Sequence, residues 1–277
     1  MARIARKSKT ALAAEIAANE AAAPVIIDHH TQLGSWSAET ELTAADEAAL
    51  LRSEIADEAV STEVEAIEAS QTDDFTAVLA SFDDSIVTDM AFKIAEAIDQ
   101  RVEFETDKAP DNASIQRTLK KVRQELVTKR AARVLLATKI EPTFVNRVLH
   151  DGSRYNVYAL GKLADLIRSI ADGHGLNNAI NNAVTTSLFR LKNAGIAFTG
   201  DVAKAAASDK VRIDPSIASR LVRHTVSTST APTQASSTMS ALATLGVVKV
   251  DGGSRNPTYV VTENPIAKFL EAKLLAA

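Results

Sequence analysis

Apolar residues recur at intervals of three and four positions from Phe75 onward, and this spacing continues for more than 20 residues. A period close to 3.6 places such side chains on one face of a helix. The pattern therefore predicts one long helix, and the folded body is expected to begin with it. The apolar positions are Phe75, Leu79, Phe82, Ile86, Met90, Ile94 and Ile98.

Further helical segments follow a break at residues 108–112. Asn112 has the side chain of an N-cap, and the apolar spacing after it predicts a helix that runs on until Glu141-Pro142 ends or kinks it. Two more helices are expected at about 156–171 and 177–194, and Gly195 is placed to close the second.

The first 74 residues lack a comparable pattern. Residues 1–38 show no persistent period and are interpreted as a tail. Residues 39–70 carry a thin apolar stripe among many glutamates, which is typical of a marginal helix or a disordered acidic arm. We therefore expect a flexible acidic arm at 1–74, a helical domain at 75–195 and a smaller domain at 196–277.

The smaller domain has the clearest local signals. A short strand at 196–198 and a short helix through 207 are followed by Asp214-Pro215, an N-cap with proline at the first helical position. A second helix begins at Pro232 and ends at Gly246. Two strands, 247–250 and 257–262, flank a turn of hairpin composition, and a last helix is expected at about 264–275.

A helix, a turn, a second helix and a two-stranded hairpin, in that order, resemble the winged-helix (helix-turn-helix) superfamily. Residues 233–250 are similar to its recognition helix and first wing strand. The resemblance covers about 50 residues, or about 90 if the elements at 177–207 supply the first helix and strand. It implies a mainly α fold with a C-terminal winged-helix-like module that carries a two-stranded β-wing.

The resemblance also implies which residues contact nucleic acid. The exposed face of the second helix would enter the major groove, where hydroxyl and amide groups reach base edges or phosphates. Residues on the wing and on the preceding helix would contact the backbone. The implied residues are Thr233, Gln234, Ser236, Ser237 and Ser240 on the helix, Lys249 and Arg255 in the wing, and Arg220 and Arg223 on the preceding helix.

Charge is distributed unevenly along the chain. The net charge of −4 combines residues 11–115, with 24 acidic and four basic side chains, and residues 116–277, with 11 acidic and 23 basic ones. The polar side of the helix after Asn112 is basic, so a phosphate backbone could follow it. Its candidate residues are Arg117, Lys120, Lys121 and Arg123. A tethered acidic segment competes for the same cations, so we hypothesise that the arm masks them.

Several classes of chemistry are not indicated. The chain has no cysteine, and it contains no phosphate-binding glycine loop, no nucleophile elbow and no spaced set of His, Asp and Ser. His29 and His30 lack a third ligand at suitable spacing. We therefore expect no enzyme, no cofactor and no metal site. No apolar run is long enough for a membrane span, and the start is unlike a signal peptide, so a cytosolic protein, or a viral one made in a cytosol, is expected.

These observations favour a nucleic-acid-binding protein, with DNA preferred over RNA, that uses the C-terminal module and the basic helix. The alternative is a structural or assembly protein, for example a viral component. In that interpretation the helical body forms homo-oligomers and the wing contacts other proteins.

Overall fold

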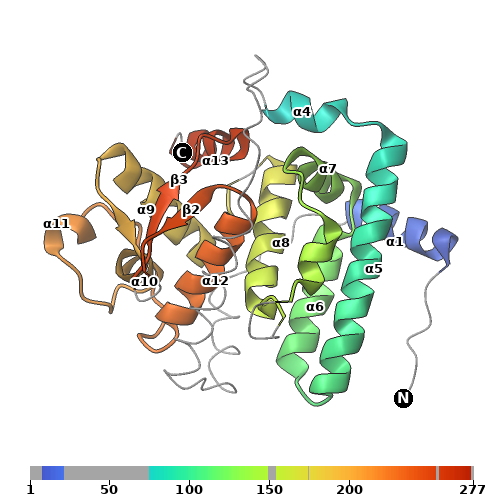
Figure 1. Ribbon diagram of the computed structural model, residues 1–277, viewed down its shortest axis with the longest axis horizontal. Coiled ribbons are helices and arrows are strands. Elements are labelled where there is room, and N and C mark those ends of the chain that lie inside the picture. The colour runs from blue at the N-terminus through green and yellow to red at the C-terminus, as the bar shows by residue number, and fades with distance from the viewer. Residues whose placement is uncertain (1–7, 22–74, 149–153, 174, 254–255, 276–277) are drawn as a thin grey trace.

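Helices make up most of the computed structural model, which describes residues 8–21, 75–148, 154–173, 175–253 and 256–275 (Figure 1). A three-stranded antiparallel sheet lies near the C-terminus. The mainly helical fold expected from the sequence is therefore confirmed. The acidic stretch at 39–70, His29, His30 and Arg255 lie outside the described residues.

Consecutive helices between residues 75 and 172 form the body. The helices α5 and α6 pack side by side, and α8 packs against α6 and α7 (Figure 1). The elements of the body are α4 (Phe75–Ser81), α5 (Asp84–Lys108), α6 (Ala113–Leu126), α7 (Lys129–Ala137), the 3₁₀ helix η1 (Pro142–Asn146) and α8 (Val157–Asp172).

The long helix predicted from Phe75 is wrong, because the chain breaks before α5. The Asp83 carboxylate accepts a hydrogen bond of 2.8 Å from the backbone N–H of Ser85 and caps the new helix. The break shifts the helical phase, so Ile86 is 52% exposed instead of buried. The buried side of α5 is formed mainly by Val87, Ala91, Ile94, Ala95 and Ile98.

A second break divides the helix predicted after Asn112. Asn112 is the N-cap of α6 as expected, because its side chain accepts a hydrogen bond of 3.1 Å from the N–H of Ile115. At Thr128 the hydroxyl accepts a hydrogen bond of 3.0 Å from the N–H of Ala131 and starts α7. Local capping by a threonine side chain interrupts the helix even though the apolar spacing continues.

The C-terminal elements build the sheet and the helices around it. Each β-strand pair is antiparallel, in the order β1-β3-β2, with Phe198 opposite Tyr259 and Val248 opposite Val261. The elements are α9 (Ala179–Asn193), β1 (Phe198–Thr199), α10 (Gly200–Ala207), α11 (Pro215–Ala218), α12 (Ala231–Thr244), β2 (Val248–Asp251), β3 (Thr258–Val261) and α13 (Pro265–Leu275).

The helix predicted to precede α12 is only one turn long. Asp214 caps α11 through the N–H of Ser216, but α11 ends at Ala218, and the helix that packs along α12 is α10. An antiparallel bridge between Ser208 and Thr225 closes the segment between α10 and α12 into a lobe. The lobe, defined here as residues 209–224, lies at the edge of the molecule away from the body (Figure 1).

α12 lies between the two parts of the chain. One side packs against α10, and another packs against α8 of the body. Buried apolar residues of both parts belong to one continuous core. α9 packs against α10, α12 and α13, so the boundary drawn from the sequence at residues 195 and 196 separates α9 from the helices that it contacts.

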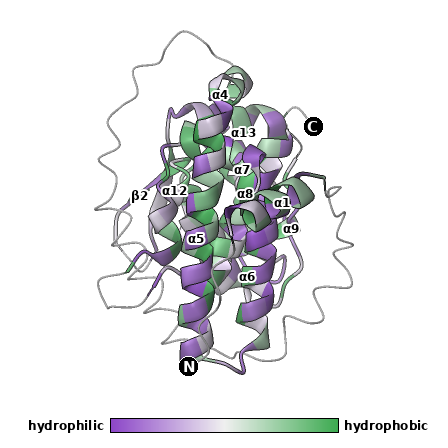
Figure 2. Cartoon of the chain, turned by 90° about the vertical axis from the view of Figure 1, so that its right-hand side faces the viewer, coloured by the Kyte–Doolittle hydropathy of each residue, from purple (hydrophilic) through white to green (hydrophobic). Residues whose placement is uncertain are grey.

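An additional helix, α1 (Lys9–Ala21), occupies part of the predicted tail. It lies across the body, in front of α5 and near α6 (Figure 2), and it packs against α7. Ile16 is its buried side chain, and Asn19 donates a hydrogen bond of 3.0 Å to the carbonyl of Val127. A segment with one buried apolar residue shows no periodic stripe, so hydrophobic spacing could not reveal it.

Candidate nucleic-acid interface

The accessible side chains of α12 lie in its first turns and at its last residue, Thr244, which lines the groove described below. Thr233, Gln234 and Ser236 are half-buried, whereas Ser237 and Ser240 are buried at 3% and 7% exposure. The expectation that all five lie on an exposed face is therefore wrong for Ser237 and Ser240. The reason is that α12 is covered on two sides, and the small side chains of a Ser- and Ala-rich helix fit either a buried or an exposed surface equally well.

The buried half of α12 is held by polar contacts to the body. The Ser240 hydroxyl lies 3.4 Å from the Tyr155 hydroxyl, which is also 3.2 Å from the hydroxyl of Thr244. Thr238 donates a hydrogen bond to the side chain of Asn181 on α9. These contacts hold the second half of α12 inside the fold and leave its N-terminal end at the surface.

The lobe carries exposed cations close in sequence to that end of α12. Lys210, Arg212 and Arg220 are exposed. The lobe closes at Thr225, six residues before α12 begins. Lys210 and Arg212 were missed in the sequence analysis, although two cations in three residues just before the Asp214-Pro215 helix start were a usable signal.

Arg223 is half-buried, and its side chain contacts the backbone of the protein. Its guanidinium group donates to three carbonyls, those of Ala205, Ser208 and Val211, at 3.0, 3.0 and 2.6 Å. A cation at the C-terminal end of α10 also satisfies helix carbonyls that have no partner within the helix. The guanidinium group is therefore committed to joining the lobe to α10.

The hairpin gives one exposed cation in the described residues, Lys249 on β2. Arg255 lies outside them. The tip of the hairpin is attached to α10, because the side chain of Asn256 accepts a hydrogen bond of 2.9 Å from the N–H of Asp201, and the Pro257 carbonyl accepts one from Gly200. A Cβ on Gly200 would lie 3.1 Å from Asn256, so a glycine suits this close approach.

The basic helix α6 is divided between exposed and paired cations. Arg117 and Lys120 are exposed, whereas Lys121 lies 3.7 Å from the buried carboxylate of Glu125. Arg123 is half-buried and bonded to carboxylates of Glu15 and Asp99. The structure thus leaves two of the four predicted α6 residues open to solvent.

A buried polar cluster joins α6, α8 and α9. Lys162 donates to the side chain of Asn178 at 2.9 Å, and Asn181 donates to Asp165 at 2.8 Å. Burial lowers the pKa of Lys162 to about 7, and burial also raises the pKa of Glu125 to about 7. All of these groups lie inside the helical packing, so the cluster orients the helices.

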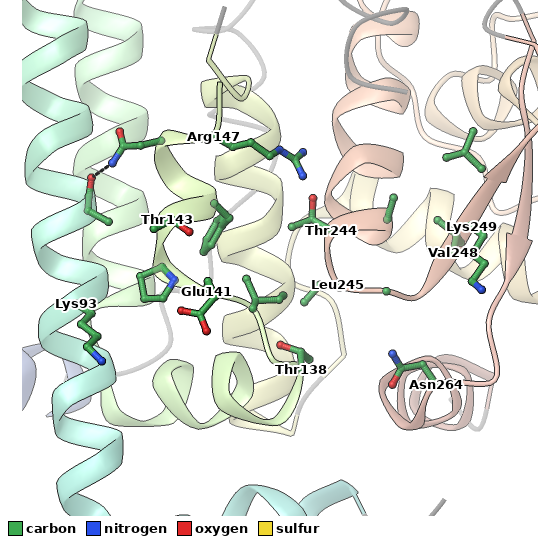
Figure 3. Close-up of a pocket in the computed structure, with 18 of the residues that line it drawn as sticks. Lys93, Thr138, Glu141, Thr143, Arg147, Thr244, Leu245, Val248, Lys249 and Asn264 are labelled. Atoms are coloured by element: carbon green, nitrogen blue, oxygen red, sulfur yellow. Dashed lines mark hydrogen bonds between the residues drawn. The ribbon is translucent and has the colours of Figure 1, made fainter. Parts of the chain in front are cut away.

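A groove of about 950 Å³ separates the body from the hairpin (Figure 3). Its walls come from α5 and η1 on one side and from the end of α12 and β2 on the other. Lys93 and Glu141 line the body side, Lys249 lines the opposite side, and Arg147 extends toward α12. The Arg147 guanidinium lies 4.9 Å from the centre of the Tyr155 ring. Side chains of both signs of charge line the groove.

The described residues provide neither a metal-binding cluster nor a membrane-spanning helix. No group of three or more His, Asp or Glu side chains among them is placed to hold a metal ion. In the same residues, no helix combines the length and the apolar character needed to cross a bilayer.

Comparisons with known proteins give no further guidance. The chain matches no protein family, and neither a curated protein nor a solved structure is significantly similar to it.

Proposed function

We propose that the protein binds duplex nucleic acid, with DNA preferred, through the accessible N-terminal turns of α12. The single observation that carries the proposal is that side chains in the first turns of α12 are accessible, whereas those in its middle are buried. Its first turns present Thr233, Gln234 and Ser236, and residues 237–243 are buried where the helix packs against α8 and α10. Recognition helices of helix-turn-helix proteins contact bases with their N-terminal residues.

The order of elements supports the proposal. α9, β1, α10, α12, β2 and β3 follow one another as expected of a winged-helix module, and β3 pairs with both β1 and β2. In the proposed module α10 takes the place of the helix that was expected to start at Asp214-Pro215, so the connection to α12 is the lobe instead of a short turn. The proposal therefore uses the longer form of the resemblance, about 90 residues, in which the elements at 177–207 supply the first helix and strand.

The lobe supplies the electrostatic part of binding. Lys210, Arg212 and Arg220 are exposed and lie on the segment that leads into α12. Phosphate contacts by cations give most of the affinity and orient a protein on the duplex, whereas contacts from α12 carry the sequence preference. Lys249 is a further candidate for a backbone contact.

A substitution set in the full-length chain tests this surface. We expect Lys210→Ala/Arg212→Ala/Arg220→Ala to weaken duplex binding and to reduce the slope of log K against log salt by about 2.7, since each lost phosphate contact accounts for about 0.9. The matched control removes three exposed lysines elsewhere, Lys108→Ala/Lys268→Ala/Lys273→Ala. Equal slopes for both sets, or no duplex binding by the unmodified chain at low salt, would contradict the proposal.

Gln234→Ala tests the role of α12 itself. A glutamine that bonds adenine through both side-chain atoms contributes about 1–3 kcal/mol of discrimination. The variant should therefore bind selected and random duplexes more equally while keeping the salt slope unchanged.

Assembly through the hairpin is the second candidate function. β2 is one of the two outer strands of the sheet, and its Val248, Lys249 and Val250 line the groove. An outer strand presents backbone groups that can pair with a strand of another copy. In this case sedimentation velocity would show concentration-dependent oligomers that persist at high salt, and Val250→Lys would reduce them.

A further inference from the structure

Two carboxylates of α1 bind arginines of the basic helices. Glu15 contacts Arg123 through both of its oxygens, at 2.5 Å to Nε and 3.0 Å to a terminal nitrogen. Glu20 lies 3.2 Å from Nε of Arg130 and accepts a hydrogen bond of 2.9 Å from the backbone N–H of that residue, in the first turn of α7. Glu15 therefore occupies the two-point geometry that a phosphate group prefers on an arginine, and Glu20 occupies a position between a guanidinium group and a helix N-terminal N–H that also suits an anion.

Both arginines also have carboxylate partners in the body, on other atoms. A terminal nitrogen of Arg123 donates to Asp99, and a terminal nitrogen of Arg130 donates to Asp172 at 3.0 Å. These contacts hold the side chains in place whether or not α1 is present. Removal of α1 would therefore free the Nε sides of two guanidinium groups that are already oriented.

The freed groups would extend an exposed cationic surface. Arg117, Lys120 and Arg123 follow one another at steps of three residues on α6, so they lie along one side of that helix. Arg117 and Lys120 are exposed now. Figure 2 shows α1 crossing the body at one end of α6, while hydrophilic residues continue toward the other end.

Few apolar contacts hold α1 on the body, so it is attached weakly. Ile16 is the residue of α1 that is buried, at 3% exposure, and helices of about this length are marginal in water without packing. Ion pairs that are partly exposed weaken as salt or a competing polyanion is added. A phosphate backbone competes directly with Glu15 and Glu20.

We propose that α1 is a displaceable cover on a second phosphate-binding surface, formed by Arg123 and Arg130 and continued by Arg117 and Lys120. The inference rests on the proposed function and adds a way in which binding of nucleic acid is regulated. The partner is the phosphate backbone of the duplex that α12 binds, or of a neighbouring duplex. Binding of the backbone displaces α1, and the carboxylates of α1 reduce affinity until that occurs.

The test uses full-length Glu15→Gln/Glu20→Gln, which removes the two charges and keeps side-chain size. Its control is Glu103→Gln/Glu263→Gln, which makes the same change in net charge at two exposed positions outside α1. We expect the α1 variant to bind duplex DNA more tightly than the control. Its slope of log K against log salt should steepen by about 1.8, which corresponds to two additional phosphates.

Arg130→Gln identifies the surface. In the Glu15→Gln/Glu20→Gln background it should reduce the slope by about 0.9, and in the unmodified chain it should change the slope much less. Ile16→Asp, which releases α1 without removing its carboxylates, should also raise affinity. Thermal unfolding of each variant shows that the body remains folded.

The outcomes separate the two proposals. Duplex binding by the unmodified chain, with equal affinity and slope for the α1 variant and its control, overturns the cover and leaves the proposed function in place. Duplex binding by the unmodified chain, together with tighter binding and a steeper slope in the α1 variant than in its control, supports both. Absence of binding in every variant overturns both.

Discussion

The hydroxyl of Thr238 on α12 donates a hydrogen bond of 2.9 Å to the side-chain oxygen of Asn181 on α9, and both side chains are fully buried. Asn181 in turn donates to the carbonyl of Lys162 at 3.1 Å and to the carboxylate of Asp165. One asparagine therefore joins α8, α9 and α12. This connection fixes how the proposed binding helix is oriented on the body.

Thr238→Val is expected to lower the free energy of unfolding by about 1–3 kcal/mol. Valine has nearly the same shape, so the main change is that the buried Asn181 oxygen loses its donor. Urea unfolding followed by circular dichroism measures the effect. Thr225→Val is the control, because this threonine is exposed and surface changes are usually within about 0.5 kcal/mol. Equal stability of the two variants would contradict the role of this hydrogen bond.

The shifted pKa values of Glu125 and Lys162 predict that the free energy of unfolding depends on pH and is lowest near pH 7. Burial raises the pKa of Glu125 from 4.5 to about 7, so the folded state favours the protonated carboxyl. That contribution is complete below pH 4.5 and is lost as the pH rises toward 7. Burial lowers the pKa of Lys162 from 10.5 to about 7, so the unfolded state binds the extra proton and stability rises between pH 7 and 10.5.

Two substitutions separate these contributions. Glu125→Gln should flatten the stability profile between pH 4.5 and 7, and Lys162→Met should flatten it between pH 7 and 10.5. Each unit of pKa difference corresponds to about 1.4 kcal/mol. Urea unfolding across this range provides the measurement. If both variants keep the fall in stability between pH 4.5 and 7 and the rise between pH 7 and 10.5, other groups cause this pH dependence.

Arg101 is expected to be essential for the body. It is 2% exposed, and its guanidinium donates to Glu105 at 2.8 Å and to the carbonyls of Val145 and Tyr155. Arg101→Met should cost about 3–5 kcal/mol, because it leaves the buried Glu105 carboxylate without its charge partner. Arg101→Met/Glu105→Gln should recover part of that loss. Chemical denaturation compares the three chains, and identical stabilities would be evidence against the ion pair.

Gly246 ends α12 with a positive φ of 70°. An added Cβ would lie 3.0 Å from the side-chain nitrogen of Asn264, so alanine meets both backbone strain and a close contact. We expect Gly246→Ala to lower the melting temperature, with a loss of about 1 kcal/mol or more. Gly175→Ala is the control, since no atom lies within 4 Å of its added Cβ and its φ is not positive. A loss of the same size in the control would contradict this explanation.

Much of the local structure could be predicted from the residues. The helix expected at 156–171 is α8, the one at 177–194 is α9, and the hairpin and last helix lie close to their predicted ranges. Caps, glycines and apolar spacing act within a few residues, so they can be read without the fold. The two incorrect long helices arose where a capping side chain, Asp83 or Thr128, interrupts an apolar pattern that continues.

The candidate site was only partly predictable. Ser237, Ser240 and Ser236 look alike in sequence, but only Ser236 remains accessible, because α8 and α10 cover α12 from two sides. Arg220 and Arg223 are three positions apart, and one is exposed while the other donates to three carbonyls. Burial of small polar side chains depends on neighbours that are distant in the chain.

By itself the sequence determined the mainly helical class, the hairpin and the division of charge between an acidic stretch at 11–115 and a basic one at 116–277, because these follow from local spacing and from counts of charge. Only the tertiary structure decided which cations are exposed and which are paired. Glu15 and Arg123 are 108 residues apart in the chain and meet as an ion pair in the fold. An interaction of this kind depends on packing between helices, and no period within either helix specifies it.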